Sequence, residues 1–299
     1  MTKDTHTKAS LALLKEQLKD SLQLDLDEFA LETSQTNEYV SKFVGINLSS
    51  FFQPIYDVHK GDLHGYEAIL NASLANIHET TPEFAYSYAK AAGKLVKFDR
   101  VSRTLHVLNY NRIFQGKGLL FLSVHPDLLI SVNEHGKVFE RILHAHSLPT
   151  ERVVIQIRDY STTDQSESLV SYETQLAAAI ENYHDRGYKI AIDYFGNRHS
   201  LVSRLWKLSP DYIKFDSSLV QDAEHLPRLE KTLKNLTKLI KDLDALPIVT
   251  GVETQAQLDI AISADISLIQ GGILGKAASA SELQSSDLIQ NRWSDIAAA

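Results

Sequence analysis

The sequence lacks cysteine altogether, and it has one methionine and two tryptophans among 299 residues. The absence of cysteine excludes disulfide bonds and any metal site built on thiolates. An apolar run of membrane-spanning length is also missing, and the opening residues, Met1-Thr-Lys-Asp-Thr-His6, have no apolar signal core. We therefore expect a cytoplasmic protein without a membrane segment.

Positive charge is scarce as well. With 30 Lys and Arg residues against 38 Asp and Glu, the formal net charge is −8 at pH 7. This surplus of negative charge argues against general binding to nucleic acid or to an anionic membrane. The content of 43% hydrophobic and 23% charged residues is typical of a globular protein with an ample core. The length suits one large domain with an appendage.

The appendage is expected at the N-terminus, in residues 1–47. Apolar side chains spaced by three or four residues predict a helix there: Leu11, Leu14, Leu18, Leu22, Leu26 and Phe29. Residues 30–47 are predicted to form a second short helix or a connector, with a domain boundary near Asn47. The leucine stripe could pack on its own domain, pair with a second copy in a homodimer, or bind a regulatory protein. Packing on its own domain is the default.

The main domain, residues 48–299, alternates short apolar runs with helical patterns. Runs at 191–196, 211–216, 248–253 and 267–271 each end in polar residues or glycine. Strands that alternate with helices predict a parallel sheet, and polar residues at the carboxyl ends of strands are typical of the active-site face of a barrel. Residues 51–57 and 63–70 predict an opening hairpin, which an all-parallel barrel does not have. A helix is predicted at 281–291, near the C-terminus.

A series of short motifs runs through this domain. In order they are Gln53-Pro-Ile, Gly65-Tyr-Glu67-Ala-Ile-Leu70, Lys97-Phe-Asp99-Arg100, Asp193-Tyr-Phe-Gly196, Lys214-Phe-Asp216, Gly251-Val-Glu253-Thr and Gln270-Gly271. Their order and spacing resemble the EAL domain family of cyclic di-GMP phosphodiesterases over roughly residues 48–280. The resemblance implies an α/β fold, a modified (β/α)8 TIM-type barrel with an antiparallel first strand, which holds the nucleotide and metal ions over the strand ends.

Active members of this family resemble two-metal hydrolases, in which Mg²⁺ or Mn²⁺ ions activate water for attack on a phosphodiester. By resemblance, the functional positions kept in this sequence are Glu67, Asp193, Lys214, Asp216, Glu253 and Gln270. Five positions carry another residue: Asn71 for an arginine that contacts phosphate, Ser123 for asparagine, Gln156 for glutamate, Tyr194 for aspartate and Thr250 for glutamate. If the match is shifted, His125 takes the asparagine position. The chain thus resembles a degenerate member.

The ligand positions that remain carry too little charge for two metal ions. Of the family's five carboxylate ligands, Glu67 and Asp193 are present, which leaves about two positive charges uncompensated if two divalent ions bind. Unit charges ~4 Å apart repel by about 4 kcal/mol even at an effective dielectric of 20. The ring of Tyr194 is expected to fill space that a metal needs, and Arg198 stands where the family prefers a second glycine. We predict no metal cofactor, with Mg²⁺ or Mn²⁺ relevant only if residual activity persists.

Three functions are compatible with this pattern. The first is a catalytically inactive regulatory protein, a pseudoenzyme, that acts through protein–protein contacts. The second is a metal-free receptor for cyclic di-GMP, in which the nucleotide contacts come from Gln53, Asp99, Arg100 and Arg198. Asn71 and Thr250 count against the receptor, and at Asn71 the loss of a charge-assisted phosphate contact removes about 1.5–3 kcal/mol. The third is a weak phosphodiesterase that uses one ion. Lys214 and Asp216 form either a structural ion pair or a relic of catalysis.

Overall fold

The computed structural model describes residues 30–43, 45–74, 78–114, 118–131, 135–158, 166–197 and 202–285, together with Lys15, Glu16 and Lys19. The predicted leucine stripe and Arg198 lie outside these described residues. Of the helix predicted at 281–291, the described part belongs to α11 (Ala280–Ser285).

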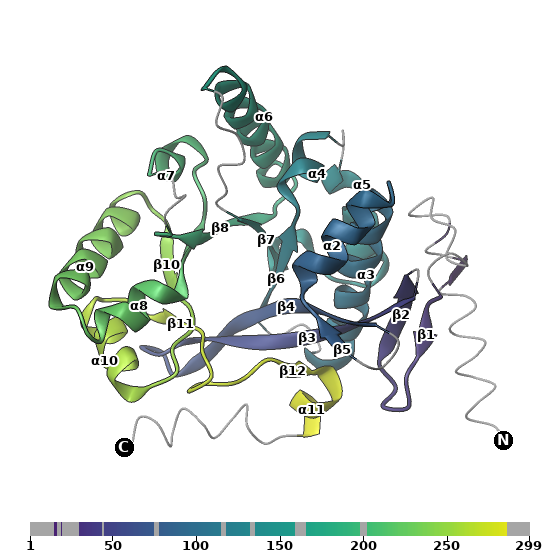
Figure 1. The fold of residues 1–299 in the computed structure, drawn as a ribbon, viewed down its shortest axis with the longest axis horizontal. Coiled ribbons are helices and arrows are strands. Elements are labelled where there is room, and N and C mark those ends of the chain that lie inside the picture. The colour runs from purple at the N-terminus through teal and green to yellow at the C-terminus, as the bar shows by residue number, and fades with distance from the viewer. Residues whose placement is uncertain are drawn as a thin grey trace.

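Eight strands of the described residues close into a barrel. They are β3 (Ile46–Asp57), β4 (Asp62–Leu74), β6 (Leu119–Val124), β7 (Val153–Arg158), β8 (Lys189–Phe195), β9 (Tyr212–Phe215), β10 (Leu246–Val249) and β11 (Leu268–Ile269). Each is hydrogen-bonded to the next, and β11 returns to β3. β3 runs antiparallel to both β4 and β11, whereas the remaining pairs are parallel. The modified barrel with an antiparallel first strand is confirmed (Figure 1).

Helices surround this barrel on its outside (Figure 1). They are α2 (Pro82–Ala91), α3 (Leu95–Phe114), α4 (Pro126–Ser131), α5 (His135–Ala145), α6 (Ser166–His184), α7 (Arg204–Lys207), α8 (Ser217–Ala223), α9 (Pro227–Asp242) and α10 (Gln255–Ser263), with a short 3-10 helix at Thr150–Arg152. Of these helices, α9 buries Leu233, Thr237 and Ile240. None of the helices in the described part of the chain combines the length and the apolar character that a bilayer crossing demands.

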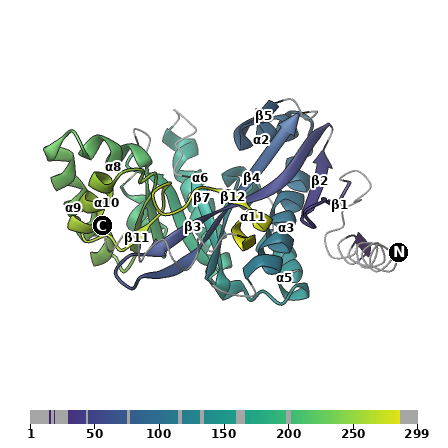
Figure 2. The ribbon, with the colours of Figure 1, turned by 90° about the horizontal axis from the view of Figure 1, so that it is seen from below.

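The described part of residues 30–47 contains β1, β2 and the start of β3 but no helix, so the short helix predicted there is wrong. β1 (Glu32–Thr33) pairs with β2 (Tyr39–Phe43), and β2 pairs antiparallel with β3. The reason is burial of alternate side chains: Ser41 and Phe43 point inward, and the Phe43 ring lies 5.1 Å from that of Phe98 on α3. The boundary expected near Asn47 falls inside β3. The hairpin of β3 and β4 extends past the barrel and carries β2 and β5 (His78–Thr80) on its two edges (Figure 2).

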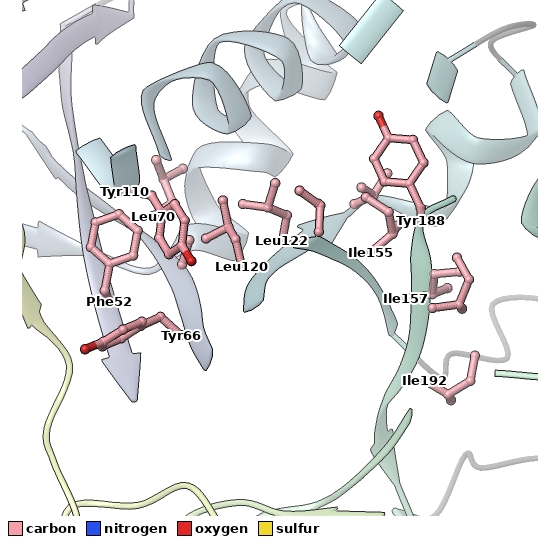
Figure 3. Packing of buried hydrophobic residues seen from close by; sticks show 14 of the residues in the cluster. Phe52, Tyr66, Leu70, Tyr110, Leu120, Leu122, Ile155, Ile157, Tyr188 and Ile192 are labelled. Carbon is pink, nitrogen blue, oxygen red and sulfur yellow. The ribbon is translucent and has the colours of Figure 1, made fainter. Parts of the chain in front are cut away.

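Alternate side chains on each barrel strand point to opposite sides of the wall. Those that point outward pack with the helices in the main core, among them Leu120, Leu122, Ile155, Ile157 and Ile192 (Figure 3). The inward ones form a smaller apolar layer: Ile55, Phe121, Val154, Ala191, Tyr212, Ile248 and Leu268. Full burial of one large apolar side chain stabilises a fold by about 1.5–3 kcal/mol. This inner layer closes the barrel beneath the polar residues that follow on the same strands.

Candidate functional site

A polar layer lies above the inner apolar layer. Because side chains alternate along a strand, the residue two positions beyond each inward apolar residue also points inward. These positions carry Ser123 on β6, Gln156 on β7, Asp193 on β8, Lys214 on β9, Thr250 after β10 and Gln270 after β11, while antiparallel β3 supplies Gln53 opposite Glu67 on β4. All of them except the buried Gln156 line a cavity of ≈ 680 Å³. The period of two thus gathers most of the predicted positions at one end of the barrel.

Lys214 sits at the centre of this layer. Its Nζ donates to Glu67 Oε2 and to Gln156 Oε1, each at 2.8 Å, and lies 3.8 Å from Asp193 Oδ1. Glu67 Oε2 also accepts from Gln270 Nε2 at 2.7 Å, and Glu67 Oε1 accepts from Gln156 Nε2 at 2.9 Å. Protein donors therefore hold both oxygens of the Glu67 carboxylate. We call these five residues the Lys214 network.

The charged members of the network are deeply buried. The side chain of Lys214 is 2% exposed, that of Glu67 15% and that of Asp193 10%. Burial pushes the pKa of Glu67 upward, but the Lys214 ammonium and the hydrogen bonds outweigh it and hold that pKa below its ordinary value. Burial is the main cause that raises the pKa of Asp193, against the opposing Lys214 charge. The two carboxylates in turn outweigh burial at Lys214 and raise its pKa.

A second cluster, which we call the rim clamp, joins Glu83 on α2, Arg158 at the end of β7 and Tyr194 on β8. Arg158 Nη2 donates to Glu83 Oε1 at 2.6 Å, and the Arg158 guanidinium carbon lies 5.1 Å from the centre of the Tyr194 ring. Tyr194 has a φ of 61°, an uncommon conformation for a bulky residue, and the pairing of β8 with β9 shifts register between Ile192 and Phe195. The local distortion leaves Tyr194 40% exposed at the cavity.

Asp216 and Glu253 are positioned differently from the Lys214 network. Asp216 caps α8, where its Oδ1 accepts from the backbone N–H of Ser218 at 3.0 Å. Lys214 pairs with Glu67 and Asp193, so the structural ion pair considered between Lys214 and Asp216 is wrong. Glu253 lines the cavity and accepts from the backbone N–H of Gly272 at 2.9 Å. Thr250 uses its hydroxyl to donate to the carbonyl of Phe215 at 2.8 Å.

Three predicted nucleotide or phosphate positions do not line the cavity. Asp99 is fully buried on α3 and pairs with Arg103 one turn later, at 2.7 Å. Arg100 is on the same helix and also lies outside the cavity lining. Asn71 lies on the hairpin extension, where its amide donates to Ser49 Oγ at 3.2 Å. The structure thus does not bring Asp99 and Arg100 to the cavity lining, and the helical period turns Asp99 toward Arg103.

Sequence reasoning also missed several cavity residues. Glu83, Tyr86 and Lys90 come from α2, His106 from α3, and Arg158 from β7. Arg158 could have been found, since it stands two positions after Gln156 and so points to the same side of the strand. His106 is buried, and this burial lowers its pKa to about 3, so the ring that contacts Ser50 Oγ at 2.9 Å is neutral.

Comparisons of sequence and structure relate this barrel to known proteins. The sequence model of the EAL domain matches residues 37–277. The chain belongs to the EAL domain family. This EAL domain is 24% identical to the uncharacterized EAL-domain containing protein YkuI of Bacillus subtilis (strain 168) over 216 residues, which make up 71% of this chain and 50% of YkuI. It is 26% identical to the probable cyclic di-GMP phosphodiesterase PdeG of Escherichia coli (strain K12) over 219 residues, 70% of this chain and 40% of PdeG.

The chain thus spans half or less of these two relatives. Among solved structures, the complex of Klebsiella pneumoniae BlrP1 with calcium and cyclic di-GMP at pH 8.0 has a TM-score of 0.69 and 21% identity. That match covers 85% of this EAL domain and 60% of the BlrP1 chain. The likeness shows the fold.

Proposed function

We propose that this EAL domain has lost the hydrolysis of cyclic di-GMP and acts as a regulatory protein through contacts with another protein. The observation that carries the proposal is the Lys214 network. A two-metal hydrolase needs several carboxylate oxygens free to coordinate cations. Here Gln156 stands at a position where, by resemblance, the family has a glutamate, and its amide donates to Glu67 Oε1 at 2.9 Å.

Because Lys214 is a position that the chain shares with active members, the proposal depends on the carboxylates that are missing around it. The two nearby carboxylates, Glu67 and Asp193, are already shared with Lys214. In the described part of the chain, no group of three or more His, Asp or Glu side chains has the arrangement of a metal site. The residues present do not fit a pair of divalent ions.

Exposed aromatic side chains support the protein-contact part of the proposal. Phe84 and Tyr88 on α2 are 47% and 40% exposed and stack on each other, and Trp206 on α7 is 56% exposed. Aromatic residues of this kind dominate the binding energy of protein interfaces.

The N-terminal segment is a second candidate contact surface. A deletion that tests it should remove residues 1–29 only, because β2 belongs to the sheet.

A turnover assay tests the proposal. The purified chain is incubated with cyclic di-GMP and Mg²⁺ or Mn²⁺, beside the Glu67→Ala variant, and the linear product is separated by anion-exchange chromatography. We expect no product from either protein above the buffer blank. Linear product formation that vanishes in Glu67→Ala would instead identify a weak phosphodiesterase and overturn the proposal.

A metal-free receptor for cyclic di-GMP is the second candidate, because the cavity of ≈ 680 Å³ lies in the range of small-molecule sites. Gln53 lines it, and solved relatives such as BlrP1 carry the same nucleotide. Against it, the lining contains four carboxylates, Glu67, Glu83, Asp193 and Glu253, but only three Lys or Arg side chains. Calorimetry with cyclic di-GMP in the absence of metal decides: heat that saturates at tens of micromolar supports the receptor, and its absence removes it.

A further inference from the structure

The three residues of the rim clamp line the cavity, and the ion pair between two of them is partly exposed. The side chain of Glu83 is 50% exposed and that of Arg158 24% exposed, so water competes for the ion pair between them. Half-exposed pairs of this kind contribute little to stability. Thr81 and the backbone N–H of Glu83 also hydrogen-bond the Glu83 carboxylate, so it keeps other partners when Arg158 is released, while Arg158 stays oriented by the Tyr194 ring at 5.1 Å.

The surroundings of Arg158 define what could replace Glu83. Lys90 on α2 also lines the cavity, and Tyr86 stacks on His125 with ring centres 6.3 Å apart and an angle of 27°. Together with Tyr194 these rings offer flat surfaces for an aromatic group. The floor is unsuited to an anion, because Glu67 and Asp193 outnumber Lys214 there. An anionic group is favoured at the mouth and a ring behind it.

We propose that the rim clamp is an anion-exchange gate, and that the cavity binds a small aromatic anion whose phosphate or carboxylate takes Arg158 from Glu83. The guanidinium suits either group, because its planar fork binds both in the same bidentate way. Arg158 and Glu83 match no position of the motifs that relate the chain to its family, and the gate does not require loss of hydrolysis.

The test is a calorimetric titration of the full chain with 1-naphthyl phosphate, and with neutral 1-naphthol as the comparator. In Glu83→Gln the competing charge is gone, and we expect the affinity for 1-naphthyl phosphate to rise about three- to tenfold. In Arg158→Gln we expect it to fall at least tenfold, because a charge-assisted bond is lost. The affinity for 1-naphthol should stay the same in both. Glu173→Gln, which removes a partly exposed ion pair with Lys207 at 2.7 Å, is the matched control.

The two variants shift the affinity in opposite directions, which a general loss of structure does not do. Melting curves identify a variant that fails to fold. If Arg158→Gln does so, Arg158→Lys replaces it, and its affinity for 1-naphthyl phosphate should be lower than that of the wild type. Equal phosphate affinity in the wild type and the Arg158 variant overturns the gate, as does an unchanged or lower affinity in Glu83→Gln. Absence of binding at millimolar concentration in both the wild type and Glu83→Gln also overturns it. Turnover of cyclic di-GMP is a separate readout, so failure of the proposed function remains distinguishable.

Discussion

Replacement of Lys214 by methionine tests whether the ammonium holds the polar layer together. Methionine keeps the apolar stem but leaves Glu67 and Asp193 buried beside each other without a cation. Removing one partner of a buried ion pair costs about 3–5 kcal/mol, because the remaining charge is left without compensation. At about 2.1 cal/mol/K of unfolding entropy per residue, a chain of 299 residues loses about 5–8 °C in Tm.

The effect should depend on pH in a defined direction. The pKa of Glu67 is held below its ordinary value in the fold, so its contribution is present above the unfolded value of 4.5 and is lost as pH falls through the folded pKa. The penalty of Lys214→Met should therefore be larger at pH 7 than at pH 4. Urea unfolding at both pH values measures it.

Two comparisons make this result interpretable. Lys207→Met removes a lysine from a partly exposed pair with Glu173 and should cost no more than about 1 kcal/mol. The double variant Glu67→Gln with Lys214→Met removes both charges and should recover part of the loss. A cost below about 1 kcal/mol for Lys214→Met, or the same cost at pH 4 and pH 7, would refute the assignment of Lys214 as the cation of this layer.

Two further predictions concern titration. Because the pKa of Asp193 is raised in the fold, its ionisation at neutral pH opposes folding, and Asp193→Asn should raise Tm at pH 7 but not near pH 3; a lower Tm at pH 7 would contradict this. The pKa of His106 is lowered from 6.5 to about 3, so the stability from its neutral ring is present above pH 6.5 and is lost as pH falls toward 3. His106→Asn should remove about 1.4 kcal/mol per pH unit from the slope of unfolding free energy between pH 6.5 and 4.5, and equal slopes in chemical denaturation would argue against a neutral buried ring.

The sequence predicted the positions of side chains correctly where the alternation along a strand determines them. The alternation of two along the strands places Asp193, Lys214 and Gln270 in one inward layer, and the motif series identified the antiparallel first strand. The sequence did not predict β2. Its five residues are too few to show a clear alternation of buried and exposed side chains, and the strand is fixed by its pairing with β3, a different segment of the chain. The motif series did not show that Asp99 pairs with Arg103 one turn later on the same helix, where Arg103 also lies over the Phe139 ring at 4.3 Å.

For a related reason, the sequence did not predict which residues pair in the rim clamp and in the Lys214 network. Whether a lysine pairs with the acid two residues later or with acids on other strands depends on which way each backbone turns, and Asp216 leaves the barrel interior to cap α8. Arg158 could have been predicted from the same alternation of side chains that located Gln156. Its partner Glu83 was not, because α2 meets β7 only after the chain has folded.

The most direct test of the account is anomalous diffraction from a crystal soaked in manganese. We predict that the wild-type protein shows no manganese peak beside Glu67 and Asp193, since these two carboxylates are shared with Lys214 and the neighbouring position carries the amide of Gln156. The variant with Ser123→Asn, Gln156→Glu, Tyr194→Asp and Thr250→Glu is the positive control and should bind the metal. Two peaks ~3.5–4 Å apart in the wild type, the spacing of a two-metal site, would contradict the account.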